Sequence, residues 1–126
     1  MGAAIRVLIA DDTAHVRRML RSMLELDGFD VVADVGTGEE VTTLLAAGTE
    51  ADVIVLDERM PELGGVETAR RICDERPEQV VLLYTAFPHL ALEDAASAAG
   101  VTAVLSKVDG LESLEREITR HCTTLL

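Results

Sequence analysis

Five polar residues each follow a short apolar run, and together they could bind a divalent cation and accept a phosphoryl group. Asp11 and Asp12 come directly after IRVLIA, and Asp57 comes directly after VIVL. Thr85 follows VVLLY, and Lys107 follows AVLS. Each residue alone is ordinary, because aspartate and threonine at such places often cap a helix. Three carboxylates, one hydroxyl and one ammonium group form a much more specific combination.

Phosphoryl transfer to a carboxylate explains why these residue types would gather. Neighbouring carboxylates repel one another and raise each other's pKa. A hard cation removes this penalty, and Mg²⁺ prefers a few carboxylates together with water and phosphate oxygens. Asp57 would then be the nucleophile, with Mg²⁺ at Asp11 and Asp12. Lys107 and the Thr85 hydroxyl would bind the remaining phosphoryl oxygens, which supplies positioning and electrostatic stabilisation.

These residues can meet only if the apolar runs are parallel strands of one sheet. Five apolar runs alternate with helical patterns, and continuous apolar strands are typical of a parallel sheet covered on both faces. The sequence therefore predicts an α/β fold, a flavodoxin-like (βα)5 doubly wound parallel sheet with strand order 2-1-3-4-5. Ligands of such sheets bind at the carboxyl ends of the strands. The expected strands are residues 5–10, 31–35, 53–56, 80–84 and 103–105; the expected helices are 14–26, 39–47, 66–75, 88–99 and a last one marked by Leu111, Leu114, Ile118, Cys122 and Leu125.

Composition narrows the class of protein. The length of 126 residues suits one domain, and the net charge of −12 repels nucleic acid, so this chain alone is not expected to bind it. Cys73 and Cys122 show no metal-binding spacing, and unpaired thiols fit a reducing cytoplasm. The first residues do not form a signal peptide, and no stretch approaches the ~20 apolar residues of a membrane span. We therefore expect a cytoplasmic protein outside the membrane.

The stretches VLIADD, VIVLDERMP, LLYTA and GVTAVLSK resemble response-regulator receiver domains of two-component signalling. The resemblance covers nearly the whole chain, so residues 1–126 are expected to form one receiver domain. It implies that Asp57 takes a phosphoryl group from the phosphohistidine of a sensor histidine kinase or phosphotransfer protein. It also implies that Mg²⁺ is bound directly by Asp12 and Asp57, partly through water by Asp11, and by the backbone carbonyl of Arg59.

Two positions depart from the pattern of that family. Val104 stands where an aromatic residue is usual, three positions before Lys107, and Val108 stands where a proline with a cis bond is usual. A cis bond before a non-proline residue costs ~2.5–4 kcal/mol, so we expect a trans bond and a different loop here. The stretch LDERMPELGGVE is most similar to receivers that carry a C-terminal helix-turn-helix output domain.

The signal should be read out and switched off at identifiable places. The alanine-rich helix 88–99 buries little large apolar surface, so we expect phosphorylation to shift it together with strand 103–105 and the last helix, changing a partner or homodimer contact. Arg59 and Phe87 follow Asp57 and Thr85 by two residues and should flank the path of an attacking water. We expect self-catalysed phosphorylation and slow self-dephosphorylation.

Two other functions compete with this switch. A Mg²⁺-dependent phosphohydrolase of the haloacid-dehalogenase type needs an Asp-x-Asp pair, which DER at 57–59 and DDT at 11–13 both lack. A receiver-like interaction module that takes no phosphate would normally lose an acid or the lysine, and this chain keeps all five positions. The departures at Val104 and Val108 are the main support for the interaction module.

Overall fold

Five parallel strands form one sheet whose buried position explains their continuous apolar sequences. In the computed structural model, which describes residues 3–122, the neighbouring strands are all parallel and lie in the order β2-β1-β3-β4-β5. This is the expected strand order, and each expected strand is present with its ends displaced by one residue at most. The strands are β1 (Arg6–Ala10), β2 (Asp30–Val35), β3 (Val53–Asp57), β4 (Val80–Thr85) and β5 (Ala103–Ser106).

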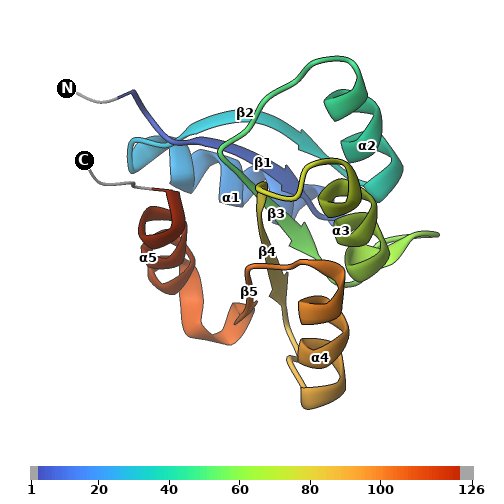
Figure 1. The fold of residues 1–126 in the computed structure, drawn as a ribbon. Helices are drawn as coiled ribbons and strands as arrows, with labels where there is room; N and C mark the ends of the chain where they lie inside the picture. The colour runs from blue at the N-terminus through green and yellow to red at the C-terminus, as the bar shows by residue number, and fades with distance from the viewer. Residues whose placement is uncertain (1–2, 123–126) are drawn as a thin grey trace.

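Five helices cover the two faces of the sheet and create a separate apolar core on each (Figure 1). Successive residues of a strand point to opposite faces, so Leu8 packs beneath α2, α3 and α4 while Val7 and Ile9 pack beneath α1 and α5. Leu125, a predicted marker of the last helix, lies outside the described residues. The helices are α1 (Ala14–Leu26), α2 (Gly38–Ala46), α3 (Gly64–Glu75), α4 (Leu90–Ala99) and α5 (Gly110–Cys122).

The start of α4 differs from the prediction for a local reason. The helix was expected from Pro88, but it begins at Leu90. His89 is the N-cap, and its Nδ1 accepts a hydrogen bond from the backbone N–H of Leu92 at 3.2 Å. A cap residue has an extended backbone, so Pro88 lies before the helix rather than in its first turn.

The connection from β5 to α5 contains the departure at Val108. Residues Lys107–Asp109 form a short 3₁₀ helix, and the Ser106 hydroxyl caps it by accepting from the Val108 backbone N–H at 3.1 Å. The described chain has no cis peptide bond, so the bond before Val108 is trans as expected. Val108 is 83% exposed beside the carboxyl edge of the sheet. Across residues 3–122, no helix is long and apolar enough to cross a membrane.

Candidate functional site

The five predicted residues meet at the carboxyl edge of the sheet. Asp11 and Asp12 follow β1, Asp57 and Thr85 are the last residues of β3 and β4, and Lys107 directly follows β5. A pocket of about 260 Å³ opens at this edge, and Asp11 is buried and not among the residues that line it. The pocket is lined by Asp12, Thr13, Asp57, Arg59, Thr85, Ala86, Phe87 and Lys107.

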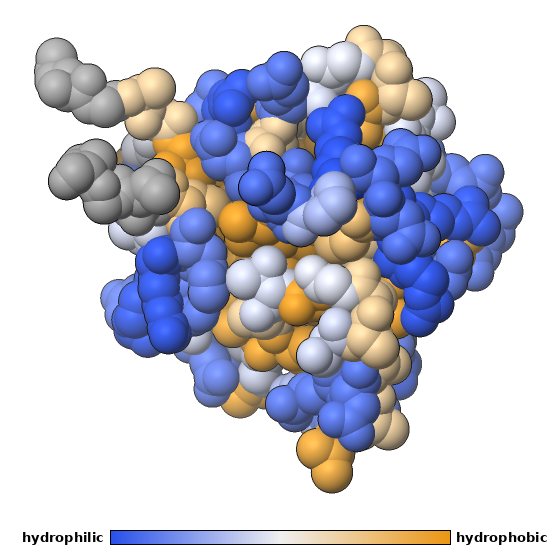
Figure 2. All heavy atoms as spheres, viewed as in Figure 1, coloured by the Kyte–Doolittle hydropathy of each residue, from blue (hydrophilic) through white to orange (hydrophobic). Residues whose placement is uncertain are grey.

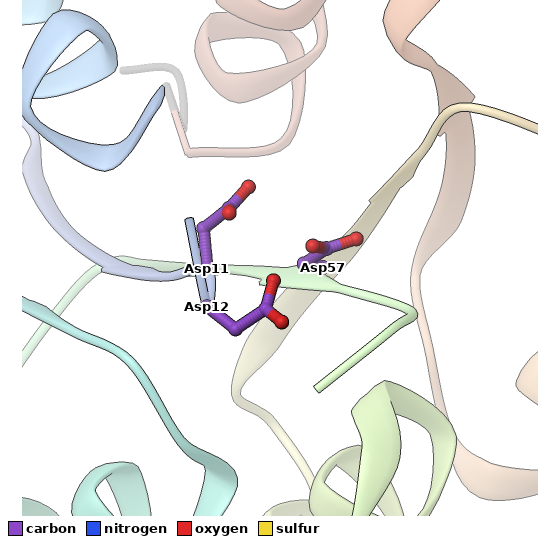
Figure 3. A group of neighbouring side chains, drawn as sticks. All are labelled: Asp11, Asp12 and Asp57. Carbon is purple, nitrogen blue, oxygen red and sulfur yellow. The ribbon is translucent and has the colours of Figure 1, made fainter. Parts of the chain in front are cut away.

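Three carboxylates offer a set of ligands suited to a hard cation. Asp11, Asp12 and Asp57 each present an oxygen, and these oxygens all lie within 4.8 Å of one another (Figure 3). Such a set, made only of carboxylate oxygens and open on one side, fits Mg²⁺, which keeps several waters and binds few protein ligands. A soft metal that prefers sulfur or imidazole would find no such ligand among these residues.

Asp11 is held firmly, whereas Asp12 is not. The Asp11 backbone N–H donates to the Val35 carbonyl at 3.0 Å. One carboxylate oxygen of Asp11 accepts from the Thr13 backbone N–H at 2.9 Å, and the other accepts from Lys107 Nζ at 2.9 Å. Asp12 is exposed, and its carboxylate receives a long bond of 3.4 Å from the Thr13 hydroxyl. Asp12 can therefore turn toward a bound ion while Asp11 keeps its place.

Lys107 bridges two acids of the site. Its Nζ lies 2.9 Å from Asp11 Oδ2 and 3.6 Å from Asp57 Oδ2, and also 5.9 Å from the centroid of the Tyr84 ring. Burial pulls the pKa of Lys107 down, but the hydrogen bond to Asp11 and the charges of Asp57 and Asp11 outweigh it, so the pKa is raised. The ammonium group therefore stays charged and is placed to bind an anionic group on Asp57.

Asp57 sits in surroundings that disfavour its charge. Burial raises the pKa of Asp57; the Lys107 charge opposes this rise, while the charges of Asp11 and Asp12 add to it. Asp57 is only 8% exposed, and its Oδ1 accepts from the Arg59 backbone N–H at 3.3 Å. A cation bound nearby would stabilise the charged form of Asp57, because it would offset the repulsion from Asp11 and Asp12.

A glycine lets α3 begin close beside Asp57. A side-chain carbon at Gly65 would collide with the Asp57 backbone oxygen and would lie 2.7 Å from a methyl group of Leu83. Gly65 also donates from its backbone N–H to the Glu58 carbonyl at 3.0 Å. The close approach fixes the loop that carries Arg59, and the paired glycines at 64–65 are its sequence signal.

Thr85 places a hydroxyl on the same edge. The residue is 4% exposed, and its Oγ1 accepts from the Phe87 backbone N–H at 3.3 Å. Because the hydroxyl acts as an acceptor here, its own hydrogen can donate to an oxygen bound on Asp57. The β4 register places Tyr84 opposite Asp57, so Thr85 lies one residue further out at the sheet edge.

Arg59 and Phe87 stand together at the mouth of the pocket. The Arg59 guanidinium carbon lies 5.9 Å from the centroid of the Phe87 ring, within the range of a cation–π contact. Both side chains are largely exposed, Arg59 at 81% and Phe87 at 70%. The sequence predicted that they flank the site, and the structure places both among the residues that line it.

Sequence reasoning missed two residues that fasten the site, Thr13 and Arg17. Thr13 binds Asp11 through its backbone N–H, which any residue other than proline provides. Arg17 donates from Nη1 to the backbone carbonyl of Asp11 at 2.6 Å. The helical spacing of α1 could have indicated that Arg17 faces the protein. Arg17 precedes the buried Leu20 and Leu24 by three and seven residues, and so lies on the same face of the helix.

Comparisons with known proteins point to one family. A family model described as the response regulator receiver domain matches residues 7–119. The transcriptional regulatory protein PdtaR of Mycobacterium tuberculosis is 36% identical over 109 residues, which are 86% of this chain and 52% of the regulator. The chain therefore spans about half the length of this relative.

Another relative and a solved structure show the same likeness. Protein-glutamate methylesterase/protein-glutamine glutaminase 3 of Hahella chejuensis is 34% identical over 82% of this chain and only 30% of its own length. A DNA-binding response regulator of the LuxR family from Staphylococcus aureus has a similar solved structure, with a TM-score of 0.87. It is 24% identical and covers 94% of this chain and 99% of that one, and this likeness concerns the fold.

Proposed function

The chain belongs to the response regulator receiver domain family, and from this we propose that it is a signalling switch phosphorylated on Asp57. The observation that carries the proposal is the meeting of three carboxylates within 4.8 Å of one another beside Lys107, at the carboxyl edge of the sheet. Asp57 is the carboxylate that also lies beside Thr85 on the neighbouring strand. Asp57 is therefore the member of the cluster best placed to carry a phosphoryl group.

The residues divide the work of the transfer. An Asp57 carboxylate oxygen attacks phosphorus, a bond from phosphorus to oxygen forms, and the bond to the donor histidine nitrogen breaks. Lys107 leaves Asp11 and pairs with the new negative charge, while the Thr85 hydroxyl donates to a phosphoryl oxygen. Asp11, Asp12, Asp57 and the Arg59 backbone carbonyl would hold Mg²⁺, which neutralises charge on the phosphoryl group.

Partners follow from the same chemistry. The donor is a sensor histidine kinase or a phosphotransfer protein, and the domain works in the cytoplasm.

The output face is formed by α4, β5 and α5, through which the domain contacts a partner or a second copy of itself. Figure 2 supports this choice, since an apolar area lies between the hydrophilic surface of α5 and the mixed surface of α4. β5 is the edge strand of the sheet on this side.

The names of two similar proteins suggest that the output is in transcription. PdtaR is named as a transcriptional regulator, and the Staphylococcus aureus protein of similar fold is named as DNA-binding. We propose that this receiver likewise takes part in regulating transcription. The resemblance of LDERMPELGGVE to receivers with a helix-turn-helix output domain supports such an output, whether the chain is a stand-alone receiver or part of a longer regulator. The receiver itself does not bind DNA, because its net charge of −12 repels the phosphate backbone.

An assay with acetyl phosphate tests the acceptor directly. With Mg²⁺ present, intact mass should show one added phosphoryl group per chain, and this addition should require the metal. Asp57→Asn should abolish it, whereas Asp74→Asn, which removes an exposed carboxylate on α3, should leave it unchanged. Equal phosphorylation of the Asp57→Asn variant would refute the assignment. No added mass on the parent would favour the interaction module instead.

A further inference from the structure

Arg17 ties the metal-binding end of β1 to the end of β2. Its Nη1 donates to the Asp11 backbone carbonyl at 2.6 Å, and its Nε donates to Asp34 Oδ1 at 3.1 Å. Asp34 also accepts from Arg21 Nη1 at 2.5 Å, so one carboxylate holds two guanidinium groups. The Arg17 and Asp34 side chains are each only 18% exposed. Arg17, Arg21 and Asp34 therefore form a partly buried hydrogen-bonded group next to the Asp11 backbone.

The contact requires the shape of a guanidinium group. Its donors lie in one rigid plane, so Arg17 can bond to a carbonyl and a carboxylate in fixed directions at the same time. Gly36, after β2, leaves the space for this plane, because a side-chain carbon there would lie 3.3 Å from Arg17 Nη1. Burial pushes the pKa of Asp34 up, but the hydrogen bonds from Arg21 and Arg17 outweigh it, so the pKa lies below its usual value.

We propose that Arg17 is a positioning residue for the divalent cation, acting through the Asp11 backbone carbonyl and not as a ligand itself. By holding the Asp11 carbonyl, it fixes the backbone from which the Asp11 and Asp12 side chains leave. Asp34 orients the guanidinium group and offsets its charge, which would otherwise repel a cation nearby. This role rests on the proposed function, because it presumes that the three carboxylates bind Mg²⁺.

Two physical effects of losing Arg17 have opposite signs, and this makes the proposal testable. Removing a positive charge near the cluster favours cation binding, since fewer like charges surround the ion. Releasing the Asp11 carbonyl disfavours binding, because the ligands must then be ordered when the ion binds. If Arg17 positions the site, the second effect is larger and the affinity falls.

Arg18 provides a matched control on the same helix. Arg17→Met and Arg18→Met remove the same charge from adjacent residues of α1, but Arg18 is exposed. Calorimetric titration with Mg²⁺ at constant ionic strength should show about tenfold weaker binding for Arg17→Met, the usual size for residues that orient metal ligands. Arg18→Met should bind as tightly as the parent or slightly more tightly. Asp12→Asn, which alters a proposed ligand, provides the positive control.

The possible outcomes distinguish failure of the Arg17 positioning role from failure of the proposed Mg²⁺ site. Binding by Arg17→Met that equals or exceeds binding by Arg18→Met would overturn the positioning role while leaving the metal site in place. No Mg²⁺ binding by the parent would overturn the metal site and this inference together. If Arg17→Met does not fold, judged by circular dichroism, Arg17→Lys replaces it. That variant keeps the charge but not the planar fork, so it should also weaken binding; unchanged affinity would overturn the role.

Discussion

Asp57 combines a buried position with neighbours of its own charge, and this combination has a chemical use. Burial raises the pKa of Asp57, and Asp11 and Asp12 reinforce the rise. A more basic carboxylate is a better nucleophile. Because the three carboxylates repel one another, binding a cation or changing the charge on Asp57 alters the electrostatic energy of the cluster strongly. Lys107 already bridges Asp11 and Asp57, so a new charge on Asp57 can redirect it without new residues entering the site.

Arg59 and Phe87 should prolong the phosphorylated state. Hydrolysis needs a water in line with the bond from Asp57 to phosphorus, and these side chains form a contact pair at the pocket mouth. Neither side chain readily orients an attacking water, and the Arg59 guanidinium can pair with phosphoryl oxygens. We expect the phosphorylated parent to lose its phosphoryl group slowly, leaving deactivation largely to a partner kinase or phosphatase.

Two substitutions measure that protection. Arg59→Asn and Phe87→Ala should each speed the decay of the phosphorylated domain by about threefold or more, equivalent to roughly 0.6 kcal/mol of barrier. The decay is followed by intact mass after removal of acetyl phosphate. Arg70→Asn, which changes a half-exposed arginine of α3, is the control. Decay of both variants at the parent's rate would show that these side chains do not guard the bond.

At the scale of residues, the sequence was informative where chemistry restricts the residue type. Asp11, Asp57 and Lys107 were predictable because few residue types can bind a cation or hold a phosphoryl group. Arg17 was not, because it differs from the exposed Arg18 only in its phase around α1, and its acceptor is a backbone carbonyl. Every residue has a backbone carbonyl, so the sequence does not show which residue accepts such a hydrogen bond.

Among the elements, α4 and β5 bury few large apolar side chains. α4 buries only Leu92, Ala96 and Ala99, and every residue of β5 is partly exposed. Val104 packs against the core beneath α3 and α4. Val104 has a small β-branched side chain with restricted rotamers, so this position offers no large ring that could move in response to a change at Thr85. A movement of Thr85 on phosphorylation would therefore have to reach the surface by displacing α4 and β5 themselves.

Hydrogen exchange can detect such a displacement. We expect phosphorylation to change the exchange of backbone amides in residues 86–110, because weakly packed elements open at low free-energy cost. Peptides from α2, on the far side of α3, should remain unchanged. Asp57→Asn protein treated in the same way is the control. Unchanged exchange throughout residues 86–110 of the phosphorylated parent would count decisively against an output face here.

Boundaries of elements were harder to predict than their existence. The strands stood out because continuous apolar runs are rare outside buried positions. The helix starts depended on details such as the His89 cap of α4 and the two glycines that open α3. These details reflect local hydrogen bonds and close packing, which apolar periodicity does not encode.

At the scale of the whole molecule, the two faces of the sheet are stabilised differently. The face under α2, α3 and α4 includes close contacts such as that between Gly38 and the Thr68 side chain. On the opposite face, α1 and α5 share one apolar core, yet acidic groups meet at its rim. Asp27 caps α1 near Glu115 of α5, and both line a hollow between the two helices.

Glu115 makes the packing of α1 and α5 sensitive to pH. Burial raises the pKa of Glu115 from 4.5 to about 7, and the neighbouring carboxylates of Asp27 and Glu112 add to the rise. Its Oε2 is buried and has no hydrogen-bond partner among the described residues. Because the folded state holds this proton more tightly than the unfolded state, the resulting stabilisation is complete below pH 4.5. It is lost as the pH rises through about 7.

Glu115→Gln should therefore remove one source of pH dependence from folding stability. Gln resembles the protonated acid, so the variant should match the parent near pH 4.5 and exceed it near pH 8. We expect a gain of roughly 1 kcal/mol at most, because a partly exposed side chain is screened by solvent. Urea unfolding at the two pH values measures the difference, and titrations shared by both proteins, such as that of Asp57, cancel. Glu93→Gln, on the exposed side of α4, should show no such pH-dependent gain. A Glu115→Gln gain that is the same at both pH values would contradict the assignment of this titration to Glu115.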